Sequence, residues 1–140
     1  MKRKLVLASH GNFAEGIKHS LELICGNTAP IQTINAYTEE GFDLTAAVAQ
    51  IMAEQAADEQ LIVVTDLFGG SVNNEFLTYI YQENFFLIAG MNLPLLIELV
   101  TQLNSPQPTT EWIQTILNSS KQLIQFCNTS VEAEMIEEDF

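Results

Sequence analysis

Three side chains with useful chemistry follow apolar runs in the sequence. His10 comes after the run in "LVLASHGNF", and Asp66 and Ser71 come after the run in "QLIVVTDLFGGS". If both runs are parallel β-strands, their carboxyl ends meet at one edge of a sheet, where ligands bind in such folds. We therefore expect His10, Asp66 and Ser71 to face one crevice, provided that the two strands are neighbours.

These residue types favour a nucleophilic histidine beside an anion site. A carboxylate next to an imidazole fixes its tautomer and leaves the other ring nitrogen free to attack. Gly69 and Gly70 let the backbone approach a ligand closely, and a helix that begins at Ser71 presents free N–H groups to a phosphate. Each residue also has a purely structural interpretation, as a strand-end, turn or N-cap residue. We predict His10 and Asp66 as catalytic residues, and Gly69, Gly70 and Ser71 as phosphate-binding residues.

Several other chemistries lack the residues that they need. The chain contains no GxxxxGK[ST] motif for a nucleotide phosphate loop, and no GxGxxG motif follows the first apolar run. A receiver domain would need an acidic pair after the first strand. Ser71, His10 and Asp66 could form a hydrolase triad on paper, but "GGSVN" is not the GxSxG elbow of such enzymes.

Strand patterns and helix patterns alternate along the chain. This order predicts a single α/β domain with a parallel sheet of about four strands, flanked by helices. The predicted strands cover residues 5–8, 31–37, 60–66 and 84–90, and the predicted helices cover residues 13–24, 44–57, 72–81 and 95–103 and a last segment from residue 112. Asn12 is the predicted cap of the first helix. Residues 123–127 fit either a helix continuation or a short fifth strand.

Composition narrows the possible partners. The chain has 140 residues and a net charge of −13, with five Lys and Arg against eighteen Asp and Glu. Nucleic acid is a poor partner for such a surface, whereas a basic protein is a plausible one. The chain has only two histidines and two cysteines, and no CxxC pair, so we expect no metal site. No apolar run is long enough for a secretory signal or a membrane span, and we expect a cytoplasmic protein.

The motifs together resemble a known family. The segments "SHG" at residues 9–11, "TDLFGGS" at 65–71 and "IAGMNLPLLIE" at 88–98 are similar to the IIA component of the mannose-family phosphoenolpyruvate:sugar phosphotransferase system. The resemblance spans about residues 3–127. It implies that His10 accepts a phosphoryl group from phospho-HPr on Nε2, while Asp66 accepts a hydrogen bond from Nδ1–H. Ser71 then matches a phosphate-facing serine.

The resemblance carries further expectations about assembly. It implies a homodimer in which a C-terminal antiparallel strand, residues 123–127 here, is exchanged between subunits. The IIA domain would cover residues 1–128. The acidic tail, residues 129–140, departs from the family pattern, and its charge predicts a mobile segment. A separate IIB protein would accept the phosphoryl group, no cofactor or metal would be needed, and the membrane would be reached only through the sugar permease complex.

Two alternative functions remain open at this point. One is the related IIA-like subunit that phosphorylates a dihydroxyacetone kinase, although "DLFGGS" argues against it. The other is a non-catalytic regulatory module that binds a small anion in the same crevice. Mannose, fructose, sorbose and gluconate-type systems share these motifs, so the motifs do not specify a sugar.

Overall fold

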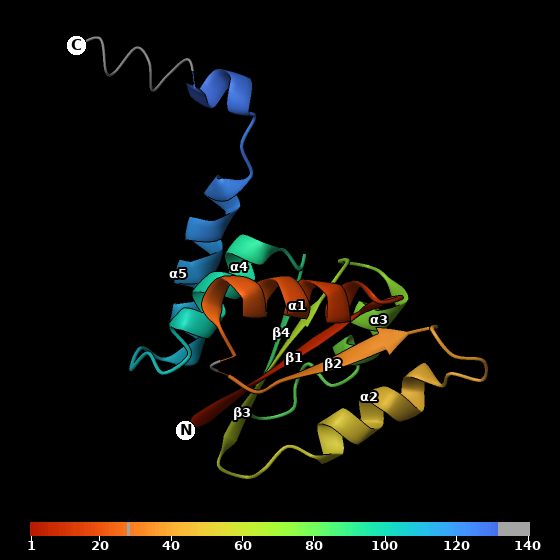
Figure 1. Cartoon of the computed structure of the whole chain (residues 1–140). Helices are drawn as coiled ribbons and strands as arrows, with labels where there is room; N and C mark the ends of the chain where they lie inside the picture. The colour runs from red at the N-terminus through yellow and green to blue at the C-terminus, as the bar shows by residue number, and fades with distance from the viewer. Residues whose placement is uncertain (28, 132–140) are drawn as a thin grey trace.

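Four parallel strands form the sheet, in the order β2–β1–β3–β4 (Figure 1). The structure is a computed structural model and describes residues 1–27 and 29–131. The strands are β1 (Lys2–His10), β2 (Ile31–Ala36), β3 (Glu59–Thr65) and β4 (Phe85–Ala89). The parallel sheet confirms the predicted fold class, and β1 and β3 are indeed neighbours, as the expected site requires.

Helices cover both faces of the sheet (Figure 1). One face packs against α1 (Phe13–Cys25), α4 (Leu93–Thr101) and α5 (Thr109–Ser120), and the other packs against α2 (Leu44–Ala53) and α3 (Ser71–Leu77). Successive side chains of a strand point to opposite faces, so Leu5 and Leu7 join the first core cluster and Val6 and Ala8 join the second. Burial on both faces explains why the strands are continuous apolar runs.

Several predicted boundaries were wrong. β1 runs from Lys2 to His10 rather than over residues 5–8, because its first residues pair with the start of β3. Helix α3 ends at Leu77 instead of residue 81, since Thr78, Tyr79 and Ile80 donate to carbonyls three residues back and tighten the chain into turns.

The start of α1 is capped by a residue that the sequence pattern did not suggest. Asn12 occupies the N-cap position but makes no side-chain capping bond. The Ser9 hydroxyl accepts the N–H of Ala14 instead, at 2.7 Å. The buried Ser9 thus joins the end of β1 to the first turn of α1, which fixes the path of the chain on both sides of His10.

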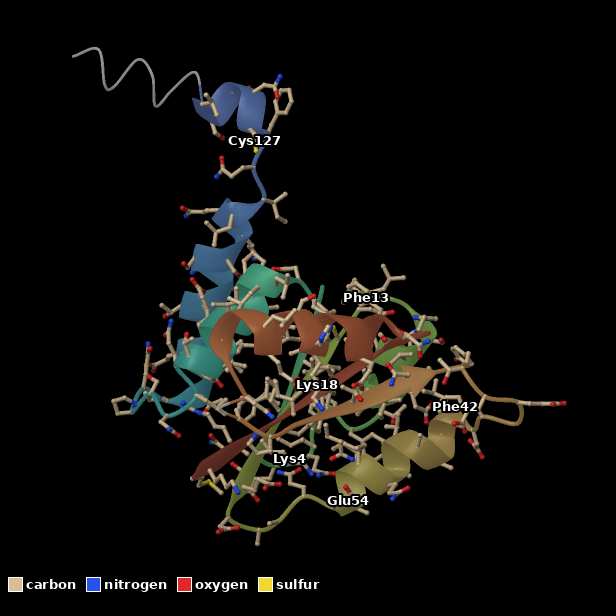
Figure 2. All side chains as sticks on the ribbon, viewed as in Figure 1. Lys4, Phe13, Lys18, Phe42, Glu54 and Cys127 are labelled. Atoms are coloured by element: carbon tan, nitrogen blue, oxygen red, sulfur yellow. The ribbon has the colours of Figure 1, made fainter. Side chains whose placement is uncertain are left out.

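The segment after α5 does not form a strand in this chain. Residues Lys121–Leu123 form a 3-10 turn, residues 124–126 have no regular structure, and residues 127–131 are helical. The segment runs away from the sheet and carries Cys127 with it (Figures 1 and 2). Its large apolar side chains are exposed: Leu123 55%, Ile124 82% and Phe126 72%. Strand exchange in a dimer therefore stays a prediction, and most of the predicted acidic tail, residues 132–140, lies outside the described residues.

No helix among residues 1–27 and 29–131 combines the length and the apolar character that a bilayer span requires.

Candidate functional site

The end of β1 and the end of β3 bring His10 and Asp66 into direct contact. His10 is the last residue of β1, and Asp66 follows β3 immediately, where its N–H donates to the Ala8 carbonyl at 3.2 Å. The Oδ2 atom of Asp66 accepts two bonds from His10, one from the backbone N–H and one from Nδ1, each 2.8 Å long. The Asp66 side chain is 14% exposed and the His10 side chain is 42% exposed. The mostly buried carboxylate therefore fixes the orientation of the imidazole ring, and the ring itself faces solvent.

The carboxylate determines the tautomer of His10. Because Oδ2 of Asp66 is an acceptor, the neutral imidazole carries its proton on Nδ1 and its lone pair on Nε2. The Oγ atom of Ser71 lies 3.2 Å from this Nε2, so the Ser71 hydroxyl donates to it. The free lone pair of a neutral imidazole is the nucleophilic position, and it points to the start of α3.

The two glycines before α3 have different parts in the site. Gly69 has a φ of +82°, a backbone conformation that side chains rarely adopt. Gly70 lies against the ring: a Cβ at this position would be 3.2 Å from Cε1 of His10 and 3.3 Å from the Leu67 carbonyl. The N–H of Gly70 already donates to that carbonyl, at 3.2 Å. Gly70 therefore permits close approach to His10, and its assignment as a phosphate-binding residue stays a prediction.

A buried hydrogen bond between β3 and α3 stabilises the loop that carries Asp66. The Thr65 hydroxyl donates to Oδ1 of Asn73 at 2.7 Å, and both residues are fully buried. This bond ties the last residue of β3 to the first turn of α3, on either side of the loop that carries Asp66. Sequence reasoning missed Asn73, because an asparagine inside a helix pattern gives no signal without its partner.

Tyr37 is a second residue that the sequence analysis did not select for the site. Its hydroxyl is 2.8 Å from Oγ of Ser71, and its ring centroid is 5.7 Å from that of His10. The residue follows β2, which is the other neighbour of β1. Its position at the carboxyl end of a strand was the signal that could have identified it.

Exposed apolar side chains lie close to His10 in the loops that form the site. Phe13 begins α1 and is 48% exposed (Figure 2). Leu67 and Phe68, in the loop after Asp66, are 58% and 80% exposed. Exposed apolar groups that gather at one place are typical of protein–protein contact sites. His19, the other histidine, is exposed on α1.

Two hollows lie at the opposite end of the sheet from His10. They have volumes of about 410 and 1100 Å³, and Arg3 lines both. The Arg3 guanidinium already donates to three loop carbonyls and to the Thr109 hydroxyl, and it lies 4.2 Å from the Trp112 ring centre. Arg3 is thus a structural clamp for residues 103–109. Within residues 1–27 and 29–131, no three His, Cys, Asp or Glu side chains are grouped as metal ligands.

Comparisons with known proteins identify the family of the chain. The family model described as "PTS system fructose IIA component" matches residues 4–117. The fructose-specific EIIA component of the Bacillus subtilis PTS is 24% identical over 130 residues, which cover 91% of this chain and 88% of that protein.

Two solved structures extend the comparison. A Klebsiella pneumoniae protein, provisionally assigned as a phosphoenolpyruvate-dependent sugar phosphotransferase system permease, is 44% identical with a TM-score of 0.89, and the match covers 94% of this chain and 95% of that one. The mannose/sorbose-specific IIA subunit from Enterococcus faecalis is 28% identical with a TM-score of 0.75, covering 89% and 94%. The chain therefore belongs to the mannose family of phosphotransferase system IIA components, which carry phosphoryl groups in sugar transport.

Proposed function

We propose that Nε2 of His10 accepts a phosphoryl group from phospho-HPr and passes it to a IIB component. The observation that carries this proposal is the 2.8 Å bond between Nδ1 of His10 and Oδ2 of Asp66. It leaves the lone pair on Nε2, where the Ser71 hydroxyl donates to it. His10 and Asp66 are the catalytic residues of this proposal.

The transfer needs little chemistry from the protein. The Nε2 lone pair forms the new N–P bond as the N–P bond to the donor histidine breaks, and the donor keeps that electron pair. The Nδ1 proton stays on His10, where the Asp66 carboxylate stabilises the positive charge that develops on the ring. We expect the Ser71 hydroxyl and the backbone N–H groups near Gly69, Gly70 and Ser71 to donate to the phosphoryl oxygens. No metal or cofactor takes part in this proposal, because the group arrives already activated on a histidine.

The contact with donor and acceptor would use the apolar side chains beside His10. Phe13, Leu67 and Phe68 are exposed there, and the chain carries a net charge of −13. A partner with an apolar patch rimmed by cations would be attracted by this field and would bury these side chains. HPr and IIB would dock in turn, and the membrane would be reached only through the permease complex that IIB serves. We therefore propose that the protein acts in the cytoplasm.

The direct test is incubation with phosphoenolpyruvate, enzyme I and HPr. A carrier gains one acid-labile phosphate per chain, and adding the IIB component then removes it. A non-catalytic anion-binding module would gain none. Transfer to dihydroxyacetone kinase in place of IIB would favour the kinase-subunit alternative.

We also propose that the protein is a homodimer in which residues 123–127 pair with the partner's sheet, within an IIA domain of residues 1–128. Ile124 and Phe126 are 82% and 72% exposed in the single chain. Burying each of them would contribute about 1.5–3 kcal/mol. The edges of the sheet, β2 and β4, offer unpaired backbone groups to such a strand.

Two truncations should distinguish the role of the exchanged segment from that of the acidic tail. A chain cut after Asn128 should stay dimeric, because it loses only the acidic tail. A chain cut after Ser120 should give aggregates or unstable monomers, because the exchanged segment is gone. Sedimentation analysis of both truncations and the full chain measures this. A well-folded monomer at full length would contradict the exchange, and the assignment of His10 would be unaffected.

Substitution of Gly70 by alanine should slow phosphoryl acceptance by about threefold. Its backbone, with φ −73° and ψ 164°, suits alanine, so the substitution disturbs the close approaches to His10 and to Leu67 without straining the backbone. The His10 ring would have to shift by only a few tenths of an ångström. Such a shift should slow transfer far less than a 1 Å misplacement of a reacting group, which lowers a rate by roughly a hundredfold. Gly16→Ala is the matched control, since a Cβ there meets nothing within 4 Å. It should raise the free energy of unfolding by about 0.5–1 kcal/mol with an unchanged transfer rate.

A further inference from the structure

A chain of two hydroxyl groups ends on the reactive nitrogen of His10. The Tyr37 hydroxyl is 2.8 Å from Oγ of Ser71, and Oγ of Ser71 is 3.2 Å from Nε2 of His10. The ring of Tyr37 lies near the imidazole, but its hydroxyl is connected to Nε2 by hydrogen bonds through Ser71. The effect of the Tyr37 hydroxyl on the nitrogen is therefore expected to pass through Ser71.

The direction of the hydrogen bonds in this chain is set by Asp66. Because Nδ1 carries the proton that Asp66 accepts, Nε2 can only accept, and the single hydroxyl proton of Ser71 is used on it. Oγ of Ser71 can then only accept from Tyr37, so the phenol donates. Such a chain strengthens each of its bonds, since every group is polarised by the one before it.

Packing and backbone geometry hold the phenol in place. The ring of Tyr37 lies edge-on to Phe42, with centroids 5.6 Å apart, and tilted against His10 at 5.7 Å. Phe42 lies just before α2, at the end of the sheet where β2 stops (Figure 2). The residue before Tyr37, Ala36, accepts the N–H of Gly11 at 2.8 Å, so the loops after β1 and β2 are tied together.

Tyr37 also has an unusual backbone. Its φ is +66°, in the left-handed region that bulky residues rarely enter. Such strain persists where the surrounding structure holds it, and it often marks functional sites. Here the left-handed turn brings an aromatic side chain, 53% exposed, onto the edge of the site.

We propose that Tyr37 is a positioning residue that keeps the Ser71 hydroxyl directed at the reacting centre. This inference rests on the proposed function. In the unmodified protein the Ser71 proton points to Nε2. When Nε2 bonds to phosphorus, its lone pair is lost, and the Ser71 hydroxyl turns to donate to a phosphoryl oxygen while Tyr37 continues to donate to Oγ. No covalent bond to Tyr37 or Ser71 forms or breaks.

The first readout needs no phosphate. In Tyr37→Phe the ring and its contacts stay, and only the hydroxyl is removed. The ¹⁵N resonance of Nε2 in unphosphorylated protein should shift toward that of an imidazole nitrogen without a hydrogen bond, while Nδ1 stays protonated. Tyr81→Phe is the matched control, since Tyr81 is fully exposed. An Nε2 resonance identical in Tyr37→Phe and in the unsubstituted protein would overturn the inference.

The second readout is transfer from phospho-HPr. Tyr37→Phe should slow the transfer step by about two- to tenfold, as expected for one neutral hydrogen bond, with little change in the KM for phospho-HPr. In a Ser71→Ala background the same substitution should have no further effect. Equal slowing with and without Ser71 would refute action through Ser71. Absence of phosphate uptake by the unsubstituted protein would refute the proposed function instead, and the nitrogen resonance would still test the hydroxyl chain.

Discussion

Replacing His10 with alanine should reduce phosphoryl acceptance from one phosphate per chain to none. Ser71 and Tyr37 are hydroxyls without a base of their own, and Asp66 is only 14% exposed, so we expect none of them to replace Nε2 as the acceptor. The fold should survive, because the His10 side chain is 42% exposed and its backbone N–H would still donate to Asp66. Phosphate incorporation from phospho-HPr measures the loss, and circular dichroism checks the fold.

His19→Ala is the matched control for this experiment. His19 is an exposed histidine on α1, so the substitution removes the same side chain without touching the site. It should leave incorporation unchanged. Incorporation that persists in His10→Ala and disappears in His19→Ala would show that the nucleophile has been misassigned.

The sheet, and the edge of it that carries His10 and Asp66, could be predicted because the sequence patterns that indicate them are local. The apolar runs of β1 and β3 are buried on both faces, and such runs have few other structures open to them. His10 and Asp66 stand directly after such runs, and the parallel sheet fixes them at one edge. Their contact follows from one pairing of strands, so it was within reach of sequence reasoning.

Other features depend on contacts between distant segments and could not be predicted in the same way. Ser9 caps α1 only because the turn after β1 folds back on it. Tyr37 reaches Ser71 across 34 positions of sequence, through a left-handed residue that its type disfavours. Phe13 matches the apolar period of α1 and yet is 48% exposed, since it begins the helix at the rim of the site rather than over the core.

A site that holds the phosphoryl group weakly would fit the proposed carrier role. No Lys or Arg occurs between Lys18 and Lys121, an interval that includes the loops after β2 and β3. The loop after β1, at residues 11–12, also contains none. The groups available are hydroxyls and backbone N–H groups, which bind a phosphoryl oxygen less strongly than a guanidinium does. A site that bound the group tightly would lower the energy of the phosphorylated state and slow its release to the acceptor.

Asp66→Asn should slow phosphoryl transfer by at least about tenfold. A hydrogen bond to a charged group contributes about 1.5–3 kcal/mol, and each 1.4 kcal/mol corresponds to about a factor of ten in rate. Oδ2 of Asp66 accepts two N–H groups from His10, and Oδ1 is buried without a hydrogen-bond partner among the described residues. The amide oxygen of asparagine could replace Oδ2, and the NH₂ group would then take the buried position of Oδ1. The developing charge on the ring would also lose its counter-ion.

Single-turnover transfer from phospho-HPr measures this effect most directly. Asp58→Asn is the matched control, because Asp58 is exposed before β3, at the opposite end of that strand from Asp66, and the substitution removes the same charge. It should transfer at the unsubstituted rate, which separates the local effect of Asp66 from the change in net charge. If Asp66→Asn also transfers at that rate while His10→Ala is inactive, Asp66 only closes the turn through the backbone N–H of His10, and the imidazole acts without a charged partner.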